Sequence, residues 1–196
     1  KRRIQAVAEM RAASKAAETR PAAAFPHRFR QIQSIAREFT LVVARVSSEN
    51  RDYLPIGIES AETIIGDRNF ALYDAPLWNM ALIASRLHWV WIGTVCVRMR
   101  TDFSYSNTLG WNTFPVPTLT EKNKADLTRC AENILLAREA HFPKTIADLY
   151  DPKEMPANLR EAHGQNDETL ERIYIGRRFK NDTERLEKLF ELYTKM

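Results

Sequence analysis

The sequence predicts an α+β fold, in which a small, mostly antiparallel sheet packs on a long buried helix and an all-helical appendage follows. Residues 39–73 hold short β-rich runs separated by polar turns, which is typical of antiparallel strands. Residues 77–98 are apolar on nearly every helical face, and a helix of that kind belongs in a core. After Pro117, apolar residues recur at helical spacing, which predicts the appendage.

A leading helix is expected over residues 3–19, because this stretch is rich in alanine and has no glycine or proline before Pro21. Its basic side chains suit a phosphate backbone. The alternative, a solvated helix surface, is slightly favoured.

Four strands are expected next, over residues 39–46, 53–58, 63–65 and 70–73. Polar turns at 47–52 and 66–69 join them. Pro55 cannot donate a ladder hydrogen bond, so its strand is expected at an edge or a bulge.

The long helix is expected to start with Asp74 as its cap and Pro76 in its first turn, and to run across the sheet to about Arg98. We expect its tryptophans in the core rather than as base-stacking platforms. Arg86 and His88 interrupt the apolar stretch, and a charged side chain is costly in a bilayer, so no membrane partner is expected.

The appendage is expected to contain helices over 120–140, 158–174 and 183–196, with a short turn at 146–150. Gly164 is a potential break in the second of these helices. The chain thus divides into residues 1–117, led by a helix over 1–20, and a helical domain over 118–196.

Charge is unevenly distributed along the chain. Residues 1–117 hold 15 Lys and Arg against 10 Asp and Glu, whereas residues 118–196 hold 14 against 15. In the first part, 13 of the basic residues are Arg, whose planar fork suits bidentate contacts to phosphate and guanine. A GC-rich genome would favour Arg throughout, yet the tail has seven Lys and seven Arg. The first part is therefore expected to face an anion.

Catalytic motifs are absent from the sequence. It contains no nucleophile elbow, phosphate-binding loop, zinc-protease or dinucleotide-binding pattern, and its four histidines lack ligand spacing. Cys96 and Cys130 form neither a redox nor a zinc motif and read as reduced thiols, which indicates a cytoplasmic protein. No catalytic, cofactor-binding or metal-binding residue is expected in this chain.

The segment RMRTDFSYSNTLGWNTFPVP, residues 98–117, places Arg100 and Asp102 ahead of an aromatic and serine run. Such side chains carry the donors and acceptors that read base edges and phosphates. Two residues at i and i+2 of an extended segment point the same way, so both can reach one base pair. From the residues alone, an ordinary Arg–Asp ion pair on a strand is the favoured alternative.

Four segments carry a family resemblance: VSSENRDYLPIGI (46–58), NFALYDAPLWNMALIASRLHWVW (69–91), residues 98–117 and the tail from 149 to 196. Together they resemble the C-terminal part of MmeI-like single-chain restriction–modification proteins and DNA methyltransferases. The resemblance implies a target recognition domain followed by a C-terminal helical domain. It also implies an upstream adenine-N6 methyltransferase domain that uses S-adenosylmethionine, and, where present, a nuclease at the far N-terminus.

The resemblance implies roles for individual residues as well. The family reads one base pair with two residues at i and i+2, which match Arg100 and Asp102 here and suit a G·C pair. Further reading positions fall at Arg45, Asp67 and Arg68. Candidate phosphate contacts are Ser47, Ser48, Arg51, Ser104, Ser106 and Asn107.

The predicted function is sequence-specific recognition of double-stranded DNA without catalysis, with S-adenosylmethionine bound only by the parent chain. The partners expected are duplex DNA and the upstream methyltransferase domain of the same parent. Two alternatives remain open: a helical protein-interaction adaptor with an incidental basic patch, and a small stand-alone enzyme.

Overall fold

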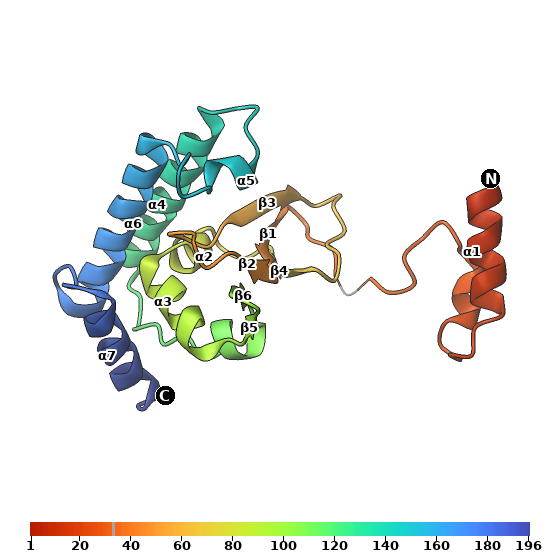
Figure 1. The fold of residues 1–196 in the computed structure, drawn as a ribbon, viewed down its shortest axis with the longest axis horizontal. Coiled ribbons are helices and arrows are strands. Elements are labelled where there is room, and N and C mark those ends of the chain that lie inside the picture. Colours follow the sequence, from red (N-terminus) through yellow and green to blue (C-terminus); the bar gives the residue numbers. More distant parts are fainter. Residues whose placement is uncertain (33) are drawn as a thin grey trace. The chain divides into compact units, whose positions relative to one another are not determined.

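The computed structural model describes residues 1–32 and 34–196, which divide into two units, Lys1–Ile35 and Ala36–Met196 (Figure 1).

The first unit consists of helix α1, Arg2–Ala12, and a 3₁₀ turn, η1, Arg20–Ala24. The Arg11 guanidinium donates hydrogen bonds to the carbonyl oxygens of Ala22 and Phe25, both at 3.0 Å, and so ties η1 to α1. The expected helix over 3–19 is too long, since the Ser14 hydroxyl accepts the Ala16 N–H at 3.2 Å in a local turn. None of the described residues of α1 and η1 is buried.

Three antiparallel strands form the first sheet, in the order β3-β1-β4: β1 Phe39–Ala44, β3 Ile56–Ser60 and β4 Asn69–Tyr73. Leu41 and Val43 of the central strand are fully buried. The edge position of β3, just after Pro55, agrees with the expectation from that proline. A strand over 63–65 is wrong, because the Thr63 N–H bonds back to the Ser60 carbonyl at 3.0 Å and turns the chain.

A second sheet, not foreseen in the sequence, has the order β2-β6-β5: β2 Val46–Ser47, β5 Arg98–Met99 and β6 Asp102–Ser104. Arg45 separates β1 from β2. Its N–H donates to the Arg68 carbonyl at 3.1 Å, and its own carbonyl accepts from the Tyr105 N–H at 2.7 Å. The expected strand over 39–46 therefore splits at Arg45, and the two halves join different sheets.

The buried helix is two helices, α2 Trp78–Ile83 and α3 Arg86–Val95. Ser85 makes the break: its Oγ accepts the His88 N–H at 3.1 Å and donates to the Leu82 carbonyl at 2.7 Å. Asp74 does not cap a helix; its carboxylate accepts the backbone N–H groups of Arg37 and Glu38 at 2.9 Å. The core position is confirmed, with every residue from 87 to 92 buried.

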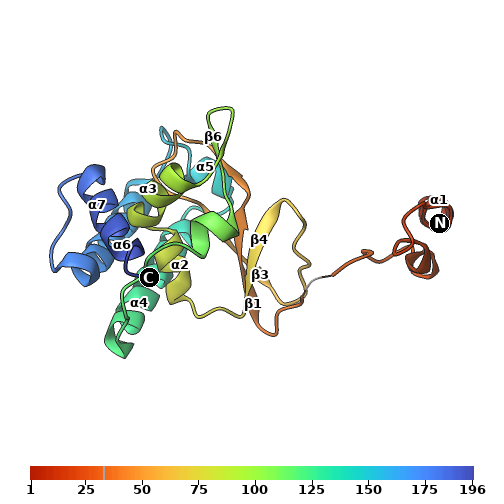
Figure 2. The same cartoon turned by 90° about the horizontal axis from the view of Figure 1, so that it is seen from below.

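The remaining elements are η2, a π-helical turn, Asn107–Trp111, and four helices, α4 Glu121–Glu139, α5 Ile146–Leu149, α6 Ala157–Ile175 and α7 Asp182–Tyr193. Thr120 and Asn123 form a reciprocal capping box at the start of α4. Helix α6 passes through Gly164 unbroken. Figures 1 and 2 show α2 and α3 between the first sheet and the helices α4, α6 and α7. Within residues 1–32 and 34–196, no helix combines the length and apolar content of a membrane span.

Candidate nucleic-acid interface

Strands β5 and β6 form a hairpin whose loop is only Arg100 and Thr101, because Met99 pairs with Asp102. Figure 2 shows this hairpin projecting from the helices at the top of the view. Arg100 has φ 60°, in the left-handed region, and so interrupts the extended segment expected from the sequence. Arg100 therefore lies in the loop and Asp102 opens β6, so the two share the hairpin tip but not one strand.

Arg98 holds the hairpin loop in place. Its Nη1 lies 2.5 Å from a carboxylate oxygen of Glu49 and donates to the Thr101 carbonyl at 3.0 Å. Its guanidinium carbon lies 4.5 Å from the centroid of the Phe103 ring, as in a cation–π contact. These three contacts tie Arg98 of β5 to the loop that carries Arg100, to β6 and to Glu49.

Arg100 is exposed and Asp102 is half-buried. Among the contacts of the described residues, neither side chain takes part in a hydrogen bond or an ion pair. The alternative of an ordinary Arg100–Asp102 ion pair is thus not realised in the described part of the chain. Both polar groups are left available to a ligand.

A second polar group consists of Arg45, Asp67 and Arg68, all of which are exposed. Arg45 Nη1 donates to the Asp67 carbonyl at 3.3 Å, and the Arg45 N–H donates to the Arg68 carbonyl. The Arg45 carbonyl oxygen accepts a hydrogen bond from the N–H of Tyr105, the residue directly after β6. Strand β6 therefore joins this group to the hairpin tip.

The candidate phosphate contacts differ in access. Ser47 is 2% exposed, and its Oγ accepts a hydrogen bond from Arg51 Nη1 at 3.3 Å. The Ser106 Oγ accepts the Leu109 N–H at 3.3 Å and so caps η2. The remaining candidates reach the surface at least in part: Ser48, Arg51, Ser104 and Asn107.

His88 of α3 packs beneath the surface against the segment that follows β6. It is fully buried, and its Nε2 lies 3.1 Å from the Tyr105 hydroxyl oxygen. The ring of Phe114 packs edge-on against it, with 4.7 Å between the ring centroids. Burial lowers the pKa of His88 to about 3, so the imidazole is neutral at physiological pH.

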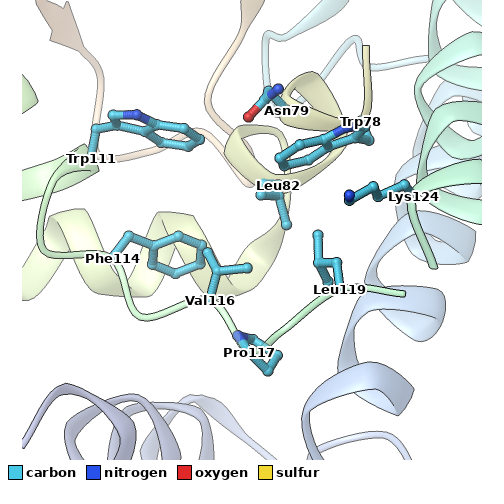
Figure 3. A pocket seen from close by; sticks show the side chains of 9 residues that line it. All are labelled: Trp78, Asn79, Leu82, Trp111, Phe114, Val116, Pro117, Leu119 and Lys124. Atoms are coloured by element: carbon cyan, nitrogen blue, oxygen red, sulfur yellow. The ribbon is translucent and has the colours of Figure 1, made fainter. Parts of the chain in front are cut away.

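An apolar pocket of about 430 Å³ opens beside this segment (Figure 3). Trp78, Leu82, Val116 and Leu119 converge on it, and Lys124 brings a charged group to its wall. Within the part of the chain that the structure describes, no group of three or more His, Cys, Asp or Glu is placed to hold a metal ion.

Family models match the chain from end to end. Residues 1–118 match the MmeI target recognition domain, and residues 119–196 match the MmeI C-terminal domain. The chain belongs to the MmeI family. The family resemblance is thereby confirmed, and the antiparallel sheets and helices described above confirm the expected α+β class.

Two relatives of the MmeI-family chain are longer proteins. DNA methyltransferase A of Bacillus subtilis (strain 168) is 39% identical over 171 residues, which cover 87% of this chain and 19% of that protein. The solved structure of the Type IIL restriction-modification enzyme MmeI in complex with DNA matches with a TM-score of 0.87 and 33% identity. That match covers 98% of this chain and 26% of the MmeI chain. The chain thus spans about a fifth to a quarter of the length of these relatives.

Several supporting residues escaped the sequence analysis. The Glu49–Arg98 ion pair and the His88–Tyr105 contact join residues far apart in sequence, and no local pattern marks such pairs. Arg45 was singled out only through the family resemblance. Its role as the link between the two sheets depends on the course of its backbone.

Proposed function

We propose that this chain is the duplex-DNA reading end of a larger adenine-N6 DNA methyltransferase of the restriction–modification type. In this proposal residues 1–117 read the DNA and residues 118–196 support them. An upstream domain of the same parent binds S-adenosylmethionine and methylates the adenine. The target recognition family and the two named relatives support this assignment.

The observation that carries the proposal is the presence of two polar groups near the two ends of β6: Arg100 with Asp102, and the group around Arg45. A strand rises about 3.4 Å per residue, so Asp102 and Tyr105 are separated by roughly 10 Å. Stacked base pairs are also spaced by about 3.4 Å. The hairpin tip and the group around Arg45 thus match a separation of about three base pairs. The major groove of B-DNA admits a two-stranded ribbon of this kind.

Within this arrangement Arg100 and Asp102 read one G·C pair. The Arg100 guanidinium donates to guanine O6 and N7, while the Asp102 carboxylate accepts from the amino group of the paired cytosine. Arg45, Asp67 and Arg68 read positions about three base pairs away from this pair.

Phosphate contacts fix the register of the chain on the duplex without reading its sequence. We assign these contacts to Ser48, Arg51, Ser104 and Asn107. Ser47 and Ser106 act indirectly, because Ser47 holds Arg51 and Ser106 caps η2. As a protein that acts on bacterial DNA, the parent would work in the cytoplasm.

Salt dependence of binding tests the proposal. The parent protein is titrated with duplex DNA between about 50 and about 200 mM salt, and we expect affinity to fall steeply because phosphate contacts release counterions. The position of methylated adenines in cellular DNA then gives the recognised sequence. Salt-independent binding, or methylation without sequence preference, would contradict a DNA-reading role and favour an interaction adaptor.

A further inference from the structure

The outer face of the second sheet carries apolar side chains between its polar ones. The strand register places Met99 beside Asp102 and Val46 beside Ser104. The Ser104 N–H also donates to the Val97 carbonyl at 2.9 Å, which sets Val97 on the other side of Ser104. Since alternate residues of a strand point to opposite faces, all five side chains share one face.

Burial agrees with this division of faces. On the inner face, Phe103 is 7% exposed, and its ring packs against that of Trp89 with the centroids 4.8 Å apart. On the outer face, Val97 is 67% exposed, Met99 55% and Val46 40%. Isolated apolar side chains are common on surfaces, but a cluster of three around candidate reading groups marks an interaction surface.

The charge around this face favours a polyanionic partner. Residues 45–51, 66–69 and 97–107 contain the turns and strands that border it. Their basic residues are Arg45, Arg51, Arg68, Arg98 and Arg100. Their acidic residues are Glu49, Asp67 and Asp102. An apolar face within an excess of arginine fits duplex DNA better than it fits an apolar protein surface.

One base edge in the major groove presents an apolar group, the 5-methyl of thymine. We infer that Met99, Val97 and Val46 contact thymine methyl groups beside the base pair that Arg100 and Asp102 read. This apolar contact makes the outer face select T·A pairs as well as a G·C pair. The inference rests on the proposed DNA-reading function and assigns a further class of base contact to it.

Deoxyuridine provides the test, because it differs from thymidine only by the missing methyl group. Methylation rates of the parent protein are compared on duplexes that contain its recognised sequence with thymine or with uracil at each position. We expect the wild type to lose about fourfold in kcat/KM at one thymine or more, the factor associated with burying one methyl-sized group. In Met99→Ala or Val97→Ala, the difference between thymine and uracil should disappear at that position.

Leu136→Ala is the matched control, because Leu136 is an apolar side chain of α4 with 62% exposure. This variant should retain the wild-type preference for thymine. Thermal unfolding of each variant establishes that it is folded.

Equal wild-type rates on thymine and uracil at every position would overturn the inference. So would full retention of the thymine preference in variants at Met99, Val97 and Val46. Variants that lose activity equally on both bases would place these side chains against deoxyribose or another protein surface, which also overturns it. The proposed DNA-reading function is tested separately. It fails if the wild type shows no sequence-specific methylation of natural DNA.

Discussion

Arg100 and Asp102 project from different backbone settings, although only Thr101 separates them in the sequence. Arg100 extends from a loop with φ 60°, whereas Asp102 projects from the start of β6 next to Met99. Their donor and acceptor groups are complementary to guanine and cytosine, respectively. Under the proposed function, the chemistry of the pair, rather than a shared strand face, decides which base pair is accepted.

Exchange of the charges at this pair should change the accepted base. We expect Arg100→Glu combined with Asp102→Arg in the parent protein to disfavour the G·C pair at one position of the recognised sequence. Each bidentate contact contributes about 1–3 kcal/mol of discrimination, so the preference should shift roughly tenfold or more. Mapping of methylated adenines in DNA from cells that express the variant measures the shift. Full activity with unchanged specificity would refute the assignment.

The family resemblance, together with the residue types, made this pair a candidate in the sequence, but neither predicted its backbone. Two-residue hairpin loops are usually marked by glycine or asparagine, which tolerate positive φ, and the Arg-Thr loop carries neither. Arg98 and Glu49 stabilise the loop instead, from positions that no local pattern connects.

At the scale of the element, the loop of the β5–β6 hairpin holds the exposed Arg100 in an unfavourable backbone conformation, with φ 60°. A non-glycine residue in the left-handed region costs roughly 1–2 kcal/mol. Arg100→Gly should therefore stabilise the protein by about 1 kcal/mol while it removes the proposed guanine contact. Urea denaturation gives the free energy of unfolding, and binding to the recognised duplex gives the loss of affinity.

Thr101→Gly is the control within the same loop, since Thr101 is not among the described residues with positive φ. There glycine adds only conformational freedom to the unfolded chain, and we expect a destabilisation of about 0.5–1 kcal/mol. Equal effects of the two glycine substitutions would show that the φ angle of Arg100 stores no strain.

Element boundaries followed from the sequence where capping signals were local. Thr120 and Asn123 mark the start of α4 within four residues, and that helix was predicted nearly to its ends. The break at Ser85 was missed, because a serine inside a long apolar run shows its capping role only when the chain turns there. Asp74 was misassigned for a related reason: its partners, Arg37 and Glu38, are more than 35 residues away.

At the scale of the molecule, the strands before Pro117 and the helices after it share one core within residues 36–196. Arg138 of α4 is 8% exposed and donates to the carbonyl of Ile56 in β3 at 2.6 Å, across 82 residues of sequence. Periodicity predicted each of these helices separately. It could not predict how they pack on the sheets, because that depends on contacts between distant residues.

Asp167 of α6 forms another long-range link. Its carboxylate is 5% exposed and accepts hydrogen bonds from the Tyr53 hydroxyl at 2.9 Å and from the Arg86 N–H at 2.7 Å. Glu171 and Arg185 are the other charged groups that influence it. Burial raises the pKa of Asp167 from 3.8 to about 6, so the folded state holds this proton more tightly than the unfolded state does.

Stability should consequently depend on pH through Asp167. The bound proton of Asp167 adds to the free energy of unfolding. This added stability is fully present below about pH 4 and is lost as the pH rises through about 6. Relative to Asp167→Asn, the wild type should lose on the order of 3 kcal/mol of unfolding free energy between these limits. Urea denaturation of both proteins from about pH 4 to about pH 7 measures this difference.

Asp148→Asn provides a control of opposite sign, because hydrogen bonds from Thr145 lower the pKa of Asp148 and its stabilisation is lost as the pH falls. A parallel pH dependence in the wild type and Asp167→Asn would mean that Asp167 is ionised in the fold at all these pH values, and that its hydrogen bonds outweigh its burial.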